Sequence, residues 1–424
     1  MPEHVFTGFG FGPIQGGLFA KEAFQSGNFS RLVVAEIDAE LVHAVKAGGG
    51  SYYLNVAGSD GIESLRIDNV ELLNPRVEQD RNTLLEALSQ STEIATCLPS
   101  VNFYESGEPD SVAWWIAEGL RNSTAKATII YAAENNNHAA EILQETVLHS
   151  SGGPLQKDLQ FLNTVIGKMS RVVTNPAEIA RLKLKTIAPD CGRAFLVEQF
   201  NRILVSRAQI ADFRPGIEVF VEKDDLLPFE EAKLYGHNAI HSVLGFIGEM
   251  MGKTSMTDLR DDGVMKIGRD AFLKESGTAL VRKYAHLGDA LFTEAGFRIY
   301  AEDLLERMTN PYLGDTVARV TRDITRKLEI DGRIFGTMQL ALEYGIEPKN
   351  MALGALAGIA VLLKKAEEYH LPEDLRLGDW RMLDTSQLKG ILNWLWTGRT
   401  CKYGPKLIES IGNAPGCLEA LTAP

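Results

Sequence analysis

The sequence predicts two domains of different class: an α/β amino-terminal domain over residues 1–225 and an all-α carboxy-terminal domain over residues 226–424. Three observations support this prediction. A chain of 424 residues is too long for one ordinary core. In the first half, short apolar runs alternate with helical segments, which is the rhythm of a parallel sheet. From about residue 226 the strand signals fade and helical periodicity continues to the end.

The first apolar run, residues 4–9, leads into a glycine-rich turn and then a helix-like segment. Strand, glycine-rich turn and helix in this order are typical of a Rossmann dinucleotide site, where backbone N–H groups approach a pyrophosphate. Gly8 and Gly10 match the first two glycines of G-x-G-x-x-G, and Gly12 before Pro13 makes the turn longer by about two residues. We expect Gly8, Gly10 and Gly12 to bind the cofactor. A glycine-rich turn without a nucleotide is the alternative.

The second predicted strand, residues 31–38, ends in acidic side chains at the distance where a Rossmann domain places a carboxylate for the adenosine ribose. We assign this role to Glu36, with Asp38 as a second candidate. A carboxylate there accepts a hydrogen bond from the ribose 2′-OH and repels a 2′-phosphate, so we expect NAD rather than NADP. Either acid could instead be a surface residue at a strand end.

Two further predicted strands, residues 93–98 and 127–133, flank a helical segment at 111–122. The second of these strands is followed by Glu134 and Asn135. Carboxyl ends of parallel strands line the ligand crevice of an open α/β sheet, so Asn135 is a candidate site residue. A turn built from asparagines is the alternative.

Residues 228–247 concentrate polar side chains on a segment that otherwise has the spacing and bulk of a buried helix. At about 100° per residue these side chains cover a wide arc, which suits a helix along the edge of a cleft. The alternative is a partly exposed helix with solvated charges and core histidines. The polar residues are Glu230, Lys233, His237, Asn238 and His241.

Lysine, four residues, asparagine, two residues and histidine form the signature of the polyol-specific long-chain dehydrogenases, and Lys233, Asn238 and His241 reproduce it. A glutamate three residues before the lysine, here Glu230, also belongs to the pattern. The chain therefore resembles this family, the mannitol dehydrogenase superfamily. An acid-asparagine pair after the strand at 127–133 extends the resemblance to Asn135.

The resemblance implies a metal-independent hydride transfer. Lys233 would be the general base, with a pKa lowered by burial and neighbouring positive charge. Asn135 and Asn238 would donate to the developing oxyanion, His241 would orient a neighbouring hydroxyl, and Glu230 would relay the proton. No metal is expected, although Glu230 and the two histidines of this helix are an alternative ligand set. The chain departs from the family at Gly167, where members commonly carry an aspartate, so the role of that acid is missing here.

A cluster of cations follows in the helical half, which is notable in a chain with a formal net charge of −13. The family has an arginine and a cation eight residues later as polyol contacts, and Arg319 and Lys327 stand at that spacing. We expect the cluster to bind an anion, with a phosphate favoured over a neutral polyol. The alternative is an exposed basic helix face paired with Asp315, Asp323 and Glu329. The cluster comprises Arg319, Arg322, Arg326, Lys327 and Arg333.

Residues 342–350 resemble the corresponding stretch of mannitol-1-phosphate 5-dehydrogenases, and the likeness runs from the first strand to about residue 360. The implied function is NAD-dependent oxidation of a polyol or polyol phosphate, with mannitol 1-phosphate to fructose 6-phosphate preferred. A free mannitol 2-dehydrogenase and a hexuronate reductase are alternatives within the superfamily. An inactive nucleotide-binding regulatory protein is the alternative from another class. The segment beyond residue 360 carries no chemical signal.

Composition narrows the partners to small molecules. The acidic excess argues against nucleic acid and anionic membrane, and no apolar run approaches the roughly 18 residues of a membrane span. We expect a soluble, cytoplasmic protein, and the sequence leaves its oligomeric state open. The four cysteines are scattered without a Cys-x-x-Cys pair, so we expect them to be reduced. They are Cys97, Cys191, Cys401 and Cys417.

Overall fold

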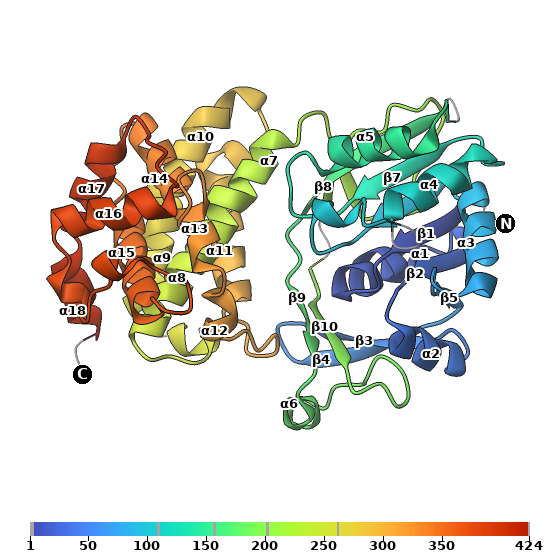
Figure 1. Ribbon diagram of the computed structural model, residues 1–424, viewed down its shortest axis with the longest axis horizontal. Helices are drawn as coiled ribbons and strands as arrows, with labels where there is room; N and C mark the ends of the chain where they lie inside the picture. Colours follow the sequence, from blue (N-terminus) through green and yellow to red (C-terminus); the bar gives the residue numbers. More distant parts are fainter. Residues whose placement is uncertain (1–3, 108–110, 156–157, 201–202, 261–262, 423–424) are drawn as a thin grey trace. The chain divides into compact units, whose positions relative to one another are not determined.

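The computed structural model describes residues 4–107, 111–155, 158–200, 203–260 and 263–422. The chain divides into two compact units, Met1–Leu227 and Pro228–Pro424 (Figure 1). The first unit combines strands and helices, and the described part of the second contains helices and no strand. The predicted α/β Rossmann domain followed by an all-α domain is confirmed. Within the described residues, no helix has the length and apolar character needed to cross a membrane.

The main sheet of the first unit has the strand order β12-β11-β8-β7-β6-β1-β2-β5. From β8 to β5 all neighbouring strands are parallel, in the 3-2-1-4-5-6 order of a doubly wound dinucleotide-binding fold. The order reverses between β1 and β6, so the carboxyl ends of these two strands border the expected ligand crevice. The strands are β1 (His4–Phe9), β2 (Phe29–Ala35), β5 (Val70–Leu73), β6 (Glu93–Thr96), β7 (Thr128–Ala132), β8 (Leu159–Ile166), β11 (Ile203–Ser206) and β12 (Phe220–Lys223).

Side chains alternate across this sheet and build a core on each face. Phe6 and Val34 belong to one core, whereas Phe9 and Val33 belong to the other. The α3, α4 and α5 helices supply the second core, and α1 and α2 contribute to the first. The helical elements of this unit are η1 (Gln15–Phe19), α1 (Ala20–Ser26), α2 (Ala39–Ala47), α3 (Glu78–Gln90), η2 (Val101–Phe103), α4 (Val112–Arg121), α5 (Ala139–Ser151) and α6 (Pro176–Arg181).

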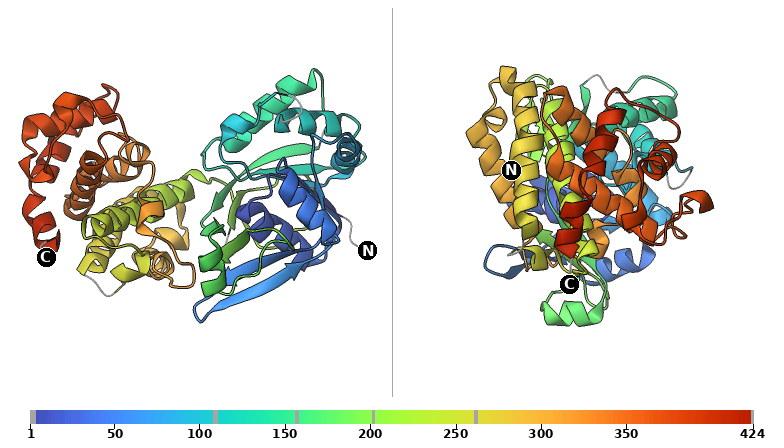
Figure 2. Two further views of the ribbon diagram at one scale, coloured as in Figure 1. Left: turned by 60° about the horizontal axis from the view of Figure 1, so that its bottom comes forward. Right: turned by 90° about the vertical axis from the view of Figure 1, so that its left-hand side faces the viewer.

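A second sheet in this unit was not predicted from the sequence. Its order is β4-β3-β10-β9, and β3 pairs with β10 across a long separation in the chain (Figures 1 and 2). Two glycines of η1 let the helix pack closely against it: a Cβ on Gly16 would lie 2.9 Å from the Phe195 ring, and one on Gly17 would lie 2.6 Å from Val197. The strands are β3 (Tyr52–Ala57), β4 (Ile62–Ile67), β9 (Ser170–Val173) and β10 (Ala194–Glu198).

The second unit is organised around α15 (Lys349–Lys364), which is buried from Met351 to Leu363. Its glycines allow close packing on α8, since a Cβ on Gly354 would lie 2.5 Å from Val243. The surrounding elements are α7 (Leu227–Glu231), η3 (Ala232–Asn238), α8 (Ala239–Met250), η4 (Met256–Leu259), α9 (Gly263–Asp270), η5 (Ala271–Gly277), α10 (Thr278–Tyr284), η6 (Ala285–Leu287), η7 (Ala290–Phe292), α11 (Glu294–Met308), α12 (Val317–Val320), α13 (Ile324–Lys327), α14 (Arg333–Glu343), η8 (Glu373–Leu375), η9 (Trp380–Met382), α16 (Thr385–Leu395), α17 (Gly404–Gly412) and α18 (Pro415–Thr422).

Candidate active site

The glycine-rich turn follows β1 and opens at Gly10. Its φ of +80° is in the left-handed region, and a Cβ there would lie 2.9 Å from the Cys97 carbonyl oxygen, so glycine is required. A Cβ on Gly12 would meet nothing within 4 Å, which leaves the backbone open to a ligand. Both glycines line a cavity of about 590 Å³ together with Glu36. This cavity lies at the β1–β6 reversal, where the fold places a dinucleotide.

The prediction for Gly8 needs correction. Gly8 lies inside β1, paired with Val34 and Ala95, and it is not part of the turn. A Cβ on Gly8 would lie 1.7 Å from the Gln15 side-chain nitrogen. The motif therefore begins at Gly10, has the ordinary length, and carries Gln15 where the third glycine usually stands. The third glycine of the motif normally lets the helix pack closely on the strand. Here the helix carries Gln15 instead, and Gly8 on the strand leaves the space for it.

The two acids after β2 have different roles. Asp38 caps α2 by accepting from the Leu41 N–H at 3.1 Å, and it pairs with Arg193 at 2.7 Å. The hydrogen bond from Arg193 lowers the pKa of Asp38. Glu36 accepts from the Phe11 N–H at 2.6 Å and from the Asp38 N–H at 2.9 Å, so backbone groups hold its carboxylate at the glycine-rich turn. Asp38 is thus engaged in structure, and Glu36 remains the candidate for the ribose.

Asn135 is exposed and follows a structural acid, Glu134. The buried Glu134 carboxylate accepts from the Thr96 hydroxyl at 2.9 Å, from the Leu98 N–H at 2.8 Å and from the Tyr104 hydroxyl. Burial raises its pKa. Glu134 therefore ties the ends of β6 and β7 together, and this holds the turn that carries Asn135.

Gly167 follows β8, where the family commonly has an aspartate. The next residue, Lys168, is buried and donates to the backbone carbonyls of Glu198 at 2.6 Å and Phe200 at 2.8 Å. The sequence analysis did not identify this buried cation. A single lysine beside a glycine carries no sequence signal of burial.

The segment with Lys233, Asn238 and His241 is not one regular α-helix. Residues Ala232–Asn238 form a π-helix, η3, between α7 and α8. The arc expected at about 100° per residue is therefore wrong. In a π-helix the hydrogen bonds run from residue i to residue i+5. Lys233 and Asn238 are five residues apart, so the wider turn brings them toward one face, whereas an α-helix would turn them well apart.

Neighbouring side chains satisfy the backbone of this π-helix. The Tyr235 carbonyl accepts from the Ser276 hydroxyl at 2.7 Å and the Thr337 hydroxyl at 3.3 Å, and the Ala232 carbonyl accepts from the Tyr300 hydroxyl at 3.4 Å. These bonds stabilise a backbone geometry that is rare in proteins and frequent at functional sites.

Charge around Lys233 favours its neutral form. Burial and the positive charge of Arg333 lower the pKa of Lys233 to about 8, against the opposing charge of Glu230. Burial, and then the charges of His241 and Arg307, lower the pKa of His237 well below its usual range. His237 is therefore neutral. Sequence reasoning missed Arg307, which lies on α11 and pairs with Asp303 at 3.0 Å.

Asp315 connects two of the predicted site residues. Its buried carboxylate accepts from Arg319 Nε at 2.6 Å and Nη2 at 2.5 Å, and its Oδ2 lies 3.4 Å from His241 Nε2 without hydrogen-bond geometry. Burial opposes ionisation, but the nearby His241 and Arg319 hold the pKa of Asp315 below its usual range. From the sequence, Asp315 was expected only as a surface partner of the basic helix face. Its signal was the i, i+4 spacing to Arg319.

The predicted cation cluster is divided, which corrects the expectation of five cations facing one anion. Arg319 is paired with Asp315, and the exposed Arg326 pairs with Asp323 at 3.3 Å, as the alternative interpretation had it. Arg322 is exposed. Within the described ranges, neither Lys327 nor Arg333 forms a salt bridge with an acid.

Within the predicted cluster, burial lowers the pKa of Lys327 and of Arg333. Lys327 is 4% exposed, and burial followed by the charge of Arg333 lowers its pKa to about 7. Burial and the charge of Arg326 lower the pKa of Arg333 to about 10. Arg333 also donates to the Ser242 hydroxyl at 3.4 Å. An anion between these cations would relieve their mutual repulsion.

The part of the chain that the structure describes brings no three His, Cys, Asp or Glu side chains into an arrangement that could hold a metal ion. Glu230, His237 and His241 therefore do not form the ligand set that was considered as an alternative. The rings of His237 and His241 are 6.1 Å apart.

Comparison with known proteins matches residues 225–375 to the mannitol dehydrogenase C-terminal domain. Mannitol-1-phosphate 5-dehydrogenase of Neurospora crassa is 27% identical over 347 residues, covering 80% of this chain and 79% of the relative. The enzyme of the same name from Arthrobacter sp. is 28% identical over 354 residues, covering 82% and 84%.

Two solved structures share the fold. A substrate-free D-sorbitol dehydrogenase has a TM-score of 0.77 at 17% identity, covering 98% of this chain and 94% of its own. Pseudomonas fluorescens mannitol 2-dehydrogenase, solved with NAD and D-mannitol, has a TM-score of 0.67 at 16% identity, covering 99% and 92%. A Rossmann unit with a helical second unit is thus the architecture of polyol dehydrogenases. The match of residues 225–375 and the similarity to these relatives support the resemblance of the chain to the mannitol dehydrogenase family.

Proposed function

We propose that this protein catalyses the NAD-dependent oxidation of a hexitol phosphate, with mannitol 1-phosphate to fructose 6-phosphate as its reaction. The observation that carries the proposal is the pair Lys327 and Arg333, cations with lowered pKa values and no salt bridge to an acid among the described residues. With a neutral hexitol, the exposed Asp323 alone among the acids acts against this positive charge, whereas a phosphate would pair with it directly. The names of the curated relatives point to the same substrate.

The first unit would hold NAD. Gly10 and Gly12 leave a backbone cradle open to a pyrophosphate, and the adjoining cavity of about 590 Å³ contains Glu36. Glu36 would accept from the adenosine ribose 2′-OH, and its charge would disfavour a 2′-phosphate. When bound, NAD supplies the acceptor for the hydride.

Lys233 would act as the general base. A lysine with a pKa of about 8 is partly neutral near neutral pH, so its Nζ can take the proton of the substrate hydroxyl while the C–H hydride leaves. In the reverse direction the protonated lysine returns that proton to the forming alkoxide. Asn238 would donate to the reacting oxygen, and Glu230 would pass the proton from Lys233 to solvent.

The remaining cations would have separate tasks. Lys327 and Arg333 would hold the phosphate. The charge of Arg319 is neutralised by Asp315. Arg319 and His241 would therefore contact hydroxyl groups of the substrate rather than its phosphate. This second arrangement would suit a free hexitol as well, and it is the observation that keeps a free-mannitol dehydrogenase as the second candidate.

The test is formation of NADH or NADPH from mannitol 1-phosphate and from free mannitol, measured with NAD and with NADP, together with consumption of NADH during reduction of a hexuronate. We expect NAD-dependent oxidation of mannitol 1-phosphate with a KM at least about 10-fold below that of free mannitol, the value of one lost charged contact. Equal KM values would favour the free-polyol candidate. A better reaction with a hexuronate would favour a sugar-acid reductase, and absence of any turnover would favour a regulatory nucleotide-binding protein.

A further inference from the structure

The connection over residues 328–332 determines where two of the proposed substrate contacts lie. Lys327 is the last residue of α13, and Arg333 is the first residue of α14. The connection between them is compact: a Cβ on Gly332 would lie 2.9 Å from the Arg326 carbonyl oxygen, and the Gln339 amide donates to the Ile330 carbonyl at 2.6 Å. These contacts set the internal shape of the segment. A displacement of the connection would therefore move both cations.

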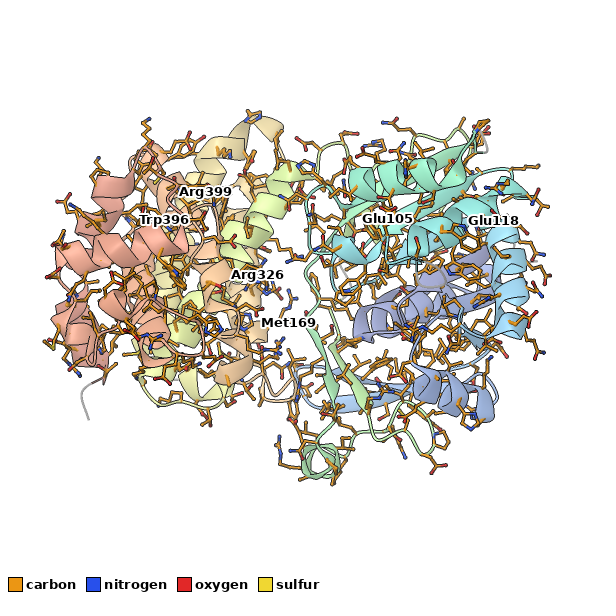
Figure 3. The ribbon with its side chains drawn as sticks, in the orientation of Figure 1. Glu105, Glu118, Met169, Arg326, Trp396 and Arg399 are labelled. Carbon is orange, nitrogen blue, oxygen red and sulfur yellow. The ribbon has the colours of Figure 1, made fainter. Side chains whose placement is uncertain are left out.

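Side chains from the end of α16 hold this connection from outside. The Trp396 indole N–H donates to the Leu328 carbonyl at 3.2 Å, directly after Lys327. The same indole packs edge-on against Phe335, two residues after Arg333, with ring centroids 5.1 Å apart and planes at 84°. Arg399 pairs with Asp331 at 2.9 Å. Figure 3 shows Trp396 and Arg399 on the same side of the helical unit.

These contacts differ in strength. Trp396 is 5% exposed, and Leu328 and Phe335 are fully buried, so the indole contacts form away from water. A buried carbonyl that loses its donor has no water to replace it. The side chains of Arg399 and Asp331 are 54% and 72% exposed, and solvent screens an ion pair of this kind. Trp396 is thus the main attachment and Arg399 a minor one.

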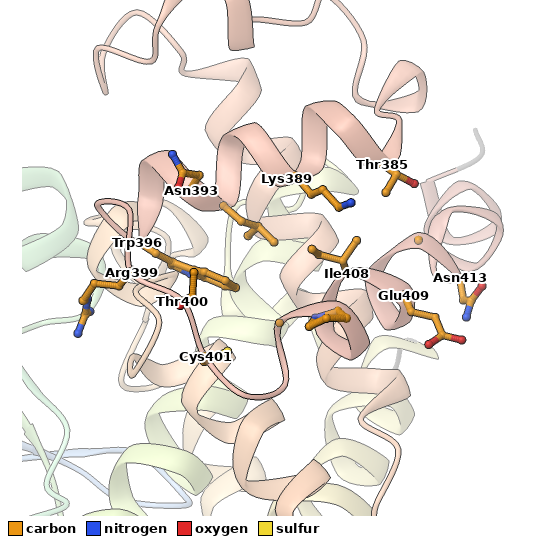
Figure 4. A pocket seen from close by; sticks show the side chains of 14 residues that line it. Thr385, Lys389, Asn393, Trp396, Arg399, Thr400, Cys401, Ile408, Glu409 and Asn413 are labelled. Atoms are coloured by element: carbon orange, nitrogen blue, oxygen red, sulfur yellow. The ribbon is translucent and has the colours of Figure 1, made fainter.

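A cavity on the other side of the indole makes the attachment sensitive to side-chain size. Trp396 and Arg399 line a cavity of about 670 Å³ between α16 and α17, together with Ile408 (Figure 4). A smaller side chain at position 396 would enlarge this space, because close-packed neighbours relax only partly into a gap. The connection would then lose its external support.

We propose that Trp396 is a positioning residue for the anionic group of the substrate, acting through the connection at 328–332 on Lys327 and Arg333. This inference rests on the proposed function. It gives a role to the end of α16, which lies outside residues 225–375, the part that matches the family domain. Trp396 touches neither substrate nor cofactor in this proposal, and its effect is confined to how well two cations are aligned.

The experiment compares Trp396→Phe, which removes the N–H and keeps an aromatic ring, with Trp396→Leu, which removes both. We expect the KM for mannitol 1-phosphate to rise about 3- to 10-fold in the first variant and more than about 10-fold in the second. The KM for free mannitol and both kcat values should change less than about 2-fold. The inhibition constant of inorganic phosphate, used as a competitive inhibitor, should rise in parallel with the KM for mannitol 1-phosphate.

Matched controls separate positioning from general damage. Trp394→Phe changes a tryptophan inside α16, two residues before Trp396, and Ile408→Ala enlarges the same cavity; neither side chain makes the contacts described above. Both should leave the two KM values unchanged, and Arg399→Gln should change them less than about 2-fold. Thermal unfolding of each variant verifies that it is folded. If Trp396→Leu is not folded, the test rests on Trp396→Phe alone.

The outcomes distinguish this inference from the proposed function. If the wild-type protein does not prefer the phosphorylated substrate, the proposed function fails, and this inference fails with it. If the wild type prefers it and Trp396→Phe folds with an unchanged KM, the inference alone is wrong. A loss shared equally by both substrates, or confined to kcat, would also overturn it, because such a loss reports general damage rather than alignment of the phosphate contacts.

Discussion

The two units use their buried charges in opposite ways. In the first unit, acids near the glycine-rich turn and the adjoining strand ends are satisfied within the protein: Glu36 by backbone N–H groups, Asp38 by Arg193, and Glu134 by hydroxyls and a backbone N–H. In the second unit, burial and the charge of Arg333 lower the pKa of Lys327, and neither of these two cations forms a salt bridge with an acid among the described residues. In the first unit, the acids near the expected ligand site thus already have partners within the protein. In the second unit, a bound anion would neutralise the positive charge that remains.

The contrast has a physical meaning. A buried charge without a partner opposes folding, and sites of this kind are where function is commonly found. Within the second unit, Asp315 shows that the fold can supply a partner: it neutralises Arg319 with two short hydrogen bonds. That Lys327 and Arg333 lack such an acid in the described structure is therefore a specific feature.

The largest effect should come from Lys233→Ala. Loss of the general base should reduce kcat at least about 10²-fold, because no positioned group then takes the hydroxyl proton. NAD binding, measured by calorimetry, should stay unchanged. Lys274→Ala, which removes an exposed lysine paired with Asp270, is the matched control and should retain normal turnover. A near-normal kcat at neutral pH in Lys233→Ala would rule out the assigned base.

The second effect concerns Lys327 and Arg333, which form no salt bridge among the described residues. Lys327→Gln and Arg333→Gln should each raise the KM for mannitol 1-phosphate about 10- to 100-fold, the range of one lost charged hydrogen bond, and leave the KM for free mannitol nearly unchanged. Arg326→Gln should have a much smaller effect, because that side chain is exposed and paired with Asp323. Equal effects at positions 326 and 333 would mean that the cluster acts as one solvated patch. The division between the exposed Arg326 and the phosphate-binding pair would then be wrong.

The fold class and the resemblance to the family could be predicted from the sequence because both have local signals. Alternating apolar runs predicted the sheet, and the spacing of Lys233, Asn238 and His241 indicated the family. It failed where geometry depends on distant contacts. The π-helix at Ala232–Asn238 is stabilised by hydroxyls from η5, α11 and α14, which no local pattern could indicate.

The division of the cation cluster was unpredictable for the same reason. Charge spacing along the chain shows that several arginines and lysines are near one another, but burial decides which of them keep water and acids as partners. Gly8 was misassigned because Gln15 takes the place of the third motif glycine, a substitution that becomes intelligible only when the strand and helix are seen in contact. The second sheet was missed because β3 and β10 meet only in the folded protein.

The third prediction tests Glu36 of the first unit as the acid that selects NAD over NADP. Glu36→Ala should reduce the preference for NAD over NADP by about 10-fold, since the 2′-phosphate no longer meets a carboxylate. The comparison of kcat/KM for the two cofactors measures this. Asp38→Asn is the control: it should lower the stability of the unit through its contacts with Arg193 and α2, and leave the cofactor preference unchanged. An unchanged preference in Glu36→Ala would show that another residue reads the ribose.

The smallest effect is a shift in the pH dependence, and it tests whether Arg333 acts on Lys233. Oxidation requires neutral Lys233, so its rate should rise with pH through the lysine pKa of about 8. The charge of Arg333 lowers that pKa, and Arg333→Gln should therefore raise it and move the ascending limb to higher pH by roughly half a unit to one unit.

The substrate for this measurement is free mannitol at saturating concentration, because it avoids the loss of phosphate binding in the same variant. At neutral pH, oxidation should then slow by up to about 10-fold in Arg333→Gln, one pKa unit being a factor of ten, while the reduction of fructose, which uses protonated Lys233, should not slow. Arg326→Gln should leave the limb in place, since Arg326 is not among the charges that act on Lys233. A limb that stays fixed in Arg333→Gln, or moves to lower pH, would mean that desolvation alone sets the pKa of the base and that the cations of this unit work independently.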